Sequence, residues 1–266
     1  MKIISKSLCF FLFIVAINIE CYSQKIVKDI QKRGELRVGM SGDQPPFAML
    51  SREDQLIGYE VQLAELLAEA MGVELKIIEI PFSELLVSLQ ERKVDVVMSG
   101  MTITTERNMK VAFVGPYILS GKSILTKSST LAAVKNASDM NKAEVKLVAL
   151  KGSTSESFVN KQIPNASLSA VANYNDAVKM LREGEADALI ADYPVCAYSV
   201  MRYPDDDFVT LNQPMTIEPI GIALPPDDPL LKNIVSNFFS QLQLTGILQQ
   251  MEQQWFKTGS WLLQVK

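Results

Sequence analysis

Short apolar segments alternate with amphipathic ones along most of the 266-residue chain, and this alternation constrains its fold more than any other feature. The predicted strands cover residues 36–40, 73–80, 94–99, 146–150, 168–172 and 186–191, and the predicted helices cover residues 59–71, 83–92, 156–162, 175–183, 230–244 and 247–257. Strands separated by short helices are typical of βαβ units, in which the helix returns the chain to a parallel neighbour. The pattern therefore predicts an α/β protein with mostly parallel sheets.

The chain also contains an internal similarity. Residues 82–100 (FSELLVSLQERKVDVVMSG) and residues 174–192 (YNDAVKMLREGEADALIAD) share an aromatic start, an amphipathic helix and a buried strand, with identity at three of 19 positions. Either these segments are equivalent parts of two similar lobes, or they share a common helix–turn–strand pattern. Two equivalent strands would end at Gly100 and at Asp192, and open α/β sheets bind ligands at such ends. Two lobes therefore predict a ligand cleft between them.

Two β-like segments, residues 119–127 and 217–226, are placed where the chain would cross between the lobes. A double crossing inserts the second lobe into the first and forms a two-strand hinge. We predict a first lobe over residues 24–120, a second lobe over residues 121–219, and a return over residues 220–266 that carries the C-terminal helices.

The N-terminus has the pattern of a secretory signal. Lys2 and Lys6 precede an apolar run over residues 8–17, which is well short of the roughly 20 residues that span a bilayer. We predict that residues 1–23 form a signal peptide and that the protein is exported to the periplasm. Glu20 before Cys21 does not fit a lipoprotein signal, so neither a lipid anchor nor direct membrane insertion is expected.

Composition narrows the function. The chain has no histidine, which excludes a Ser-His-Asp triad, a Cys-His pair and a histidine-ligated zinc site. It has 26 basic and 30 acidic residues without a basic run, so nucleic acid is not an expected partner. Because no side chain then titrates near neutrality at its ordinary pKa, ligand binding is expected to be insensitive to pH between about 6 and 8. These features favour binding over catalysis.

Two loops that follow predicted strands carry candidate binding groups. In residues 99–107 (SGMTITTER), Gly100 allows close backbone approach and Thr102 offers a hydroxyl. Arg107 falls in the first turn of a helix, where a positive charge is unfavourable unless it meets an anion such as a carboxylate. Arg107 is therefore either a carboxylate contact or a solvated surface side chain. Residues 151–156 (KGSTSE) form either a weak anion nest or an ordinary helix cap.

Asp192 ends a predicted apolar strand in the second lobe. It is either a partner for an ammonium group or a cap for the turn before Pro194. An arginine from one lobe and an aspartate from the other would together hold a zwitterion across the cleft. Phe82, at a strand-to-helix corner, either covers an apolar part of that ligand or packs in the core.

The chain resembles the periplasmic amino-acid-binding proteins of ABC importers, the family 3 solute-binding proteins, which have the type II periplasmic binding fold. The resemblance covers roughly residues 25–258 and rests on the segments GELRVG, PPF, IGYEVQLAELLAEAMG, VDVVMSGMTITTER, VAFVGPY, KGSTSESF and ALIADYP. It implies an exported protein that closes two lobes around an amino acid and delivers it to a membrane permease. It also implies a monomer that uses no metal or organic cofactor.

The resemblance assigns roles to individual residues. The positions that hold the ligand carboxylate in the family are matched by Arg107, Thr102, Ser153 and Thr154. The positions that hold the ligand ammonium are matched by Asp192, Gly100 and Thr102. Phe82 matches an aromatic that covers the ligand side chain, and Ser99 lines the floor of the same site.

Three further positions concern the ligand side chain. Ser41 stands where relatives that bind basic amino acids or glutamine have an acid, and Gln44 stands where many have an aromatic wall. Lys151 matches a lysine of the glutamine-binding branch. Because a basic side chain would lack its counter-charge at Ser41, the resemblance implies a polar, uncharged amino acid as the ligand.

Two other functions stay open on this fold. An enzyme such as a cyclohexadienyl dehydratase would need a carboxylic acid of raised pKa in the cleft. A sensory ligand-binding domain would need a partner protein, because the chain ends soon after Trp261.

Overall fold

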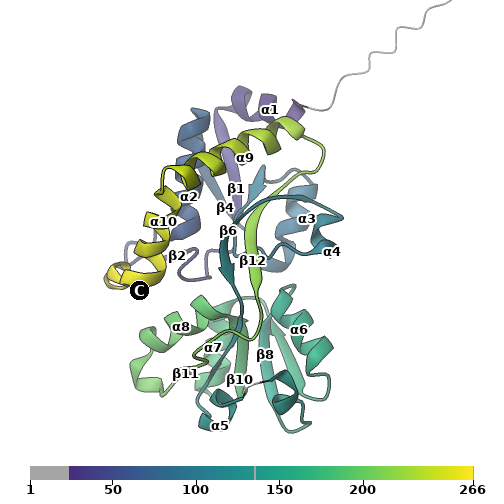
Figure 1. The fold of residues 1–266 in the computed structure, drawn as a ribbon, viewed down its shortest axis with the longest axis vertical. Helices are drawn as coiled ribbons and strands as arrows, with labels where there is room; N and C mark the ends of the chain where they lie inside the picture. Colours follow the sequence, from purple (N-terminus) through teal and green to yellow (C-terminus); the bar gives the residue numbers. More distant parts are fainter. Residues whose placement is uncertain (1–23, 135, 266) are drawn as a thin grey trace, which may run out of the picture.

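The computed structural model describes residues 24–134 and 136–265, so the predicted signal peptide lies outside the described residues. Strands and helices alternate along the chain and build two lobes, one above the other in Figure 1. The predicted α/β fold of two similar lobes is confirmed.

The first lobe contains a five-stranded sheet with the order β4-β1-β5-β12-β6. Its strands are β1 (Glu35–Met40), β4 (Glu74–Glu79), β5 (Val96–Val97), β6 (Ala112–Ser120) and β12 (Glu218–Leu224). Its larger helices are α1 (Lys25–Arg33), α2 (Tyr59–Met71), α3 (Leu85–Gln90), α9 (Pro229–Leu244) and α10 (Ile247–Glu252). β2 (Met49–Leu50) and β3 (Leu56–Ile57) form a small hairpin beside this sheet. Apolar side chains from β1, α2 and α9 form one buried core in this lobe.

The second lobe contains a five-stranded sheet with the order β11-β7-β10-β8-β9. Its strands are β7 (Lys122–Thr126), β8 (Lys146–Leu150), β9 (Ser167–Val171), β10 (Ala188–Asp192) and β11 (Val209–Thr210). Its helices are α5 (Ser129–Ala132), α6 (Thr154–Gln162), α7 (Tyr174–Arg182) and α8 (Tyr193–Arg202). All five residues of β10 are buried, which suits a central strand covered on both faces.

The two sheets have equivalent strand orders. β5 and β10 each occupy the middle position, between one parallel and one antiparallel neighbour. These strands end the two similar segments of the sequence, so the internal similarity corresponds to equivalent places in two lobes. Each sheet holds two parallel and two antiparallel pairs. The antiparallel pairs involve β6, β7 and β12, which belong to the crossings rather than to βαβ units.

The strands β6 and β12 lie side by side and carry the chain between the lobes (Figure 1). Ser120 pairs with Glu218 in this antiparallel ladder. A Cβ atom on Gly121, directly after β6, would lie 2.0 Å from the carbonyl oxygen of Thr216. The two crossings therefore approach too closely at this point for any side chain other than hydrogen.

Two of the longer helices, α1 and α8, were not predicted. α1 is held by Asp228, whose carboxylate accepts the backbone N–H of Ile26 at 2.9 Å and that of Leu231 in α9, also at 2.9 Å. α8 begins immediately after β10, with Pro194 in its first turn, where the proline restricts φ and needs no hydrogen-bond partner. Its apolar side chains resemble a strand in the sequence, which explains why this helix was missed.

The C-terminal segment departs from the single predicted helix over residues 247–257. After α10 the chain forms a π-helical turn (Gln253–Thr258) and a 3₁₀ turn (Ser260–Gln264). These turns place the Trp261 ring against Tyr198 of α8, with ring centroids 5.6 Å apart and an interplanar angle of 20°. Within the described part of the chain, no helix is long and apolar enough to cross a membrane.

Glu60 lies in the first turn of α2 and is fully buried. Its Oε1 accepts hydrogen bonds from the backbone N–H of Gly100 at 2.7 Å and from the hydroxyl of Tyr117 in β6. Burial raises the pKa of Glu60 to about 7, although both hydrogen bonds oppose this shift. The expectation of pH-insensitive binding counted ordinary pKa values only and did not include this shifted carboxyl group, which bonds to the predicted ligand contact Gly100.

The substitution Glu60→Gln is expected to stabilise the protein at pH 8 and to change its stability much less at pH 5. The unfolded carboxyl loses its proton near its ordinary pKa of 4.5, whereas the folded one keeps it up to about pH 7. The folded state thus binds more protons than the unfolded state between these pH values. The free energy of unfolding of the wild-type protein therefore falls by an amount on the order of 3 kcal/mol as the pH rises through this range. Urea unfolding at both pH values measures the difference. The same pH response in the two proteins would contradict the raised pKa.

The substitution Trp261→Ala is expected to destabilise the protein by about 3–5 kcal/mol and to loosen the contact between the lobes, because the side chain is almost completely buried against Tyr198. Trp261→Phe is the matched control, since it keeps one aromatic ring against Tyr198 and loses the smaller part of the indole together with the hydrogen bond from Nε1 to the carbonyl of Trp255. Thermal unfolding gives the stability, and small-angle X-ray scattering gives the radius of gyration. An unchanged radius in Trp261→Ala would show that the ring stack does not hold the lobes together.

Candidate ligand-binding cleft

The loops after β5 and β10 approach each other between the lobes, where polar contacts join the two halves of the protein. An Arg107 guanidinium nitrogen donates to the carbonyl of Gly152 at 3.2 Å, and the hydroxyl oxygens of Thr102 and Thr154 lie 3.3 Å apart. Both contacts link a residue of the first lobe to one of the second. The structure therefore brings the predicted carboxylate-binding residues of the two lobes into direct contact.

Arg107 lies in α4 (Thr105–Asn108), whose first turn is capped by the Thr104 hydroxyl. Its guanidinium also donates to the carbonyl of Thr102 at 2.8 Å and lies over the ring of Phe82, 5.7 Å from the centroid. Burial lowers the pKa of Arg107, and Asp192 and Glu218 oppose that shift; the group stays charged in any case. Arg107 is thus a half-buried side chain at the lobe interface rather than a solvated surface residue.

Phe82 is itself buried and belongs to an apolar cluster that contains residues of both lobes, such as Leu85 in α3 and Val148 in β8. The structure supports the core interpretation, and a contact of this ring with the ligand stays a prediction. The ring packs in the core and also forms the surface on which the Arg107 guanidinium rests.

The loop between β8 and α6 gives its three predicted residues different surroundings. The hydroxyl of Ser153 accepts the backbone N–H of Glu156 at 3.1 Å and donates to the carbonyl of Leu150 at 2.6 Å. Its one proton is therefore engaged in capping α6. Thr154 contacts the first lobe through Thr102, and the side chain of Lys151 is exposed.

Four predicted residues gather on the floor of the cleft. The hydroxyl of Ser99 accepts the backbone N–H of Ser41 at 3.0 Å and donates to the Ser41 hydroxyl at 3.1 Å. The side chain of Gln44 lies against Gly100, where a Cβ atom would be 2.1 Å from Nε2. Gln44 is 2% exposed, and its buried Oε1 has no hydrogen-bond partner among the residues that the structure describes. This orphaned acceptor points to a missing donor at the floor.

Asp192 lies at the end of β10 and does not cap the helix that follows it. Its Oδ1 accepts a hydrogen bond from the ammonium of Lys122 at 2.7 Å, and that ammonium lies 3.7 Å from Glu218 Oε2. Both Asp192 and Lys122 are at least 96% buried. The sequence analysis missed Lys122, although a single lysine after Gly121 at the start of an apolar strand is the signal that could have found it.

Asp43 is a second residue that the sequence analysis missed. Its carboxylate accepts the backbone N–H of Tyr174, the first residue of α7, at 2.7 Å. Burial raises the pKa of Asp43, and the hydrogen bonds from Tyr174 and Ser41 oppose that shift. This contact is a third polar link between the lobes, because Asp43 follows β1 and Tyr174 belongs to the second lobe.

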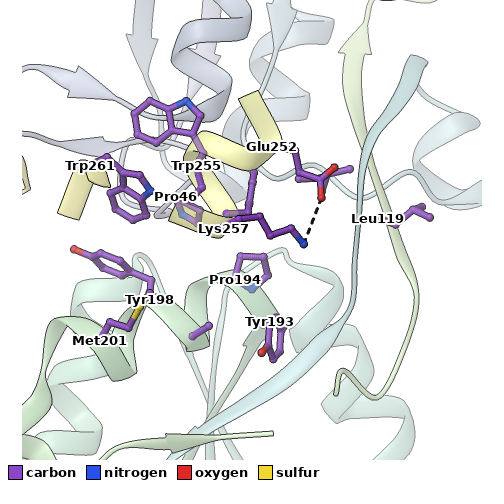
Figure 2. A pocket seen from close by; sticks show the side chains of 13 residues that line it. Pro46, Leu119, Tyr193, Pro194, Tyr198, Met201, Glu252, Trp255, Lys257 and Trp261 are labelled. Carbon is purple, nitrogen blue, oxygen red and sulfur yellow. Dashed lines mark hydrogen bonds and ion pairs between the residues drawn. The ribbon is translucent and has the colours of Figure 1, made fainter. Parts of the chain in front are cut away.

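A separate cavity of about 190 Å³ lies between the lobes beside the C-terminal segment, and Figure 2 shows the side chains that line it. Its walls are mainly apolar and aromatic, with Tyr198, Trp255 and Trp261 among them. Lys257 and Glu252 form an ion pair with each other there, 3.6 Å apart, and both are largely exposed. None of the predicted binding residues lines this cavity. The fixed charges that a zwitterion needs lie in the polar cleft instead.

The chain is similar in sequence to known proteins of two kinds, binding proteins and an enzyme. The chain is 28% identical over 231 residues to the L-cystine-binding protein TcyJ of Escherichia coli, covering 87% of this chain and 86% of the relative. It is 25% identical over 228 residues to a cyclohexadienyl dehydratase of Pseudomonas aeruginosa, covering 86% and 85%. Sequence similarity thus extends to a binding protein and to an enzyme.

The solved structures include a binding component of an ABC transporter from Wolinella succinogenes in complex with lysine. It superposes with a TM-score of 0.81 at 35% identity, covering 86% of this chain and 99% of that one. The family model for bacterial extracellular solute-binding proteins, family 3, matches residues 36–258. The match spans both lobes and every residue of the polar cleft. The chain belongs to the bacterial extracellular solute-binding proteins, family 3, the family of the amino-acid-binding proteins of ABC importers.

Proposed function

We propose that this protein is exported to the periplasm, binds a polar, uncharged amino acid between its lobes and delivers it to the permease of an ABC importer. The observation that carries the proposal is the opposed pair of charges in the cleft, Arg107 from the first lobe and Asp192 from the second. An amino acid has both complementary charges, one on each side of its α-carbon. Its binding would therefore join the lobes by two charge-assisted contacts.

The carboxylate of the ligand would lie against Arg107, which uses two of its five N–H donors in the observed contacts and keeps others for a bidentate interaction. The hydroxyls of Thr102 and Thr154 lie beside it and would donate further hydrogen bonds. Ser153 would contribute mainly by fixing the end of α6, because its hydroxyl is engaged in the cap.

The ammonium of the ligand would lie near Asp192 and the backbone of Gly100. Gln44 has a buried Oε1 that lacks a donor, and an ammonium or a side-chain amide would supply one. Ser41 and Ser99 add hydroxyls but no charge to the same floor. These neutral polar groups support an uncharged polar side chain on the ligand, whereas Lys151, which is exposed, would be a contact only at the rim.

Thermal unfolding of residues 24–266 with each of the twenty amino acids is expected to identify at least one ligand. A ligand present at 1,000 times its Kd adds about 4 kcal/mol to the free energy of unfolding, which raises the melting temperature by several degrees. If no amino acid raises the melting temperature, the assignment of an amino acid as the ligand is wrong.

The substitution Arg107→Ala is expected to weaken binding of that amino acid at least about a hundredfold, because the ligand carboxylate would lose its half-buried charged partner. Lys110→Ala is the matched control, since Lys110 is an exposed cation three residues away. Isothermal titration calorimetry measures both affinities. Equal affinities in the two variants would remove Arg107 from the site.

We further propose that the protein is a binding protein without catalytic activity. A dehydratase would need a carboxylic acid free to give its proton to a leaving group. Glu60 has a raised pKa, but its Oε1 accepts hydrogen bonds from Gly100 and Tyr117, and its Oε2, the oxygen that can carry the proton, is buried inside the protein. Incubation with prephenate and with arogenate is expected to give no product above the uncatalysed background. Turnover that disappears in Glu60→Gln would instead assign an enzyme.

A further inference from the structure

A lysine ammonium is buried next to the carboxylate proposed to hold the ligand ammonium. Lys122 is the first residue of β7 and is 1% exposed. Its Nζ donates to Asp192 Oδ1 at 2.7 Å and lies 3.7 Å from Glu218 Oε2. A buried lysine keeps its charge only where such partners replace water, so Lys122 and its two carboxylates form one electrostatic unit.

The backbone around Lys122 is also fixed. Its N–H donates to the Thr216 hydroxyl at 2.9 Å, and that hydroxyl donates to Glu218 Oε1 at 3.1 Å. Its carbonyl accepts the N–H of Met215 at 2.7 Å. These bonds connect the start of β7 to the return crossing and fix the backbone from which the ammonium extends.

The charges of four side chains near the proposed ligand position balance one another. Arg107 and Lys122 contribute two positive charges, and Asp192 and Glu218 contribute two negative ones. Asp43 and Glu60 lie on the first-lobe side of the cleft, and burial raises the pKa of each. A neutral zwitterion leaves this balance unchanged, whereas a cationic side chain adds an unmatched positive charge within the same cleft.

We propose that Lys122 is a specificity-determining residue whose fixed ammonium disfavours amino acids with cationic side chains. The effect is electrostatic and acts across the cleft, because Lys122 contacts Asp192 rather than the ligand side chain. Removing its charge would leave Asp192 and Glu218 as an excess negative pair and would attract a second cationic group. The inference rests on the proposed amino-acid-binding function and narrows its ligand class.

The test compares amino acids of equal side-chain length that differ in charge. The three neutral and cationic pairs are asparagine with 2,4-diaminobutyrate, glutamine with ornithine, and citrulline with arginine. Isothermal titration calorimetry at pH 7 gives the ratio of the two Kd values within each pair. Any effect on the shared α-ammonium and α-carboxylate cancels in this ratio. Wild-type protein is expected to bind the neutral member at least tenfold more tightly in each pair that it binds.

Three variants then assign the effect to charge. Lys122→Gln keeps a hydrogen-bond donor to Asp192 but removes the charge, and it is expected to shift the ratio about tenfold toward the cationic member. Lys122→Arg keeps the charge and is expected to retain the wild-type ratio. Glu218→Gln removes a negative charge from the same unit and is expected to shift the ratio about tenfold the other way. This last variant keeps the test decisive if Lys122→Gln does not fold.

Preferential binding of a cationic member by the wild-type protein would overturn the inference. An unchanged ratio in Lys122→Gln or, where that variant does not fold, in Glu218→Gln would overturn it as well, while neutral amino acids would still bind and the proposed function would stand. Failure of the wild-type protein to bind any member of the pairs or any of the twenty amino acids would instead overturn the proposed function itself.

Discussion

The close approach of two backbone crossings is the constraint on which the rest of the structure depends. β6 and β12 pair so tightly beside Gly121 that a Cβ atom there would overlap the Thr216 carbonyl. Two of the buried charged groups of the cleft contact this pair of strands directly. Glu60 bonds to Tyr117 in β6, and Lys122 lies beside Glu218 in β12. The crossings therefore connect the lobes and also fix the charges that a ligand would meet.

Burial sets the electrostatics of the cleft. Lys122, Asp192 and Glu60 would each lose much hydration energy on folding if they stayed charged and unpaired. Two different effects offset this loss. Lys122 and Asp192 form an ion pair, whereas the pKa of Glu60 rises to about 7, so a proton neutralises the group in acid. A chain without histidine thus still has a group that titrates near neutrality, because the surroundings of a side chain determine its pKa as much as its type does.

Local patterns in the sequence predicted individual helices and strands whose formation depends on residues close together in the chain. The helix over residues 59–71 and the strand over residues 146–150 coincide with α2 and β8, since hydrophobic period and glycine caps act within a few residues. The equivalent positions of β5 and β10 also followed from an internal similarity. α8 was missed because its buried face is nearly continuous with β10 in the sequence.

Arg107, Thr102 and Thr154 do meet between the lobes, as the sequence predicted. The pairing of Lys122 with Asp192, by contrast, joins residues 70 positions apart, and no local pattern encodes it.

The observed contacts between the lobes affect how a ligand would act. Arg107 bonds to Gly152, Thr102 meets Thr154, and Trp261 stacks on Tyr198 across the two lobes. A ligand stabilises a closed arrangement only through contacts that it makes there and not in an open one. Contacts that the lobes make directly with each other favour the closed arrangement and raise the fraction of molecules able to bind, which lowers the apparent Kd by the same factor. The same contacts also make the free and the bound protein more similar in shape. A permease that recognises the loaded form by its shape would then have a smaller difference to detect. The C-terminal ring stack lies outside the cleft, so changing it would adjust this balance without altering the residues that touch the ligand.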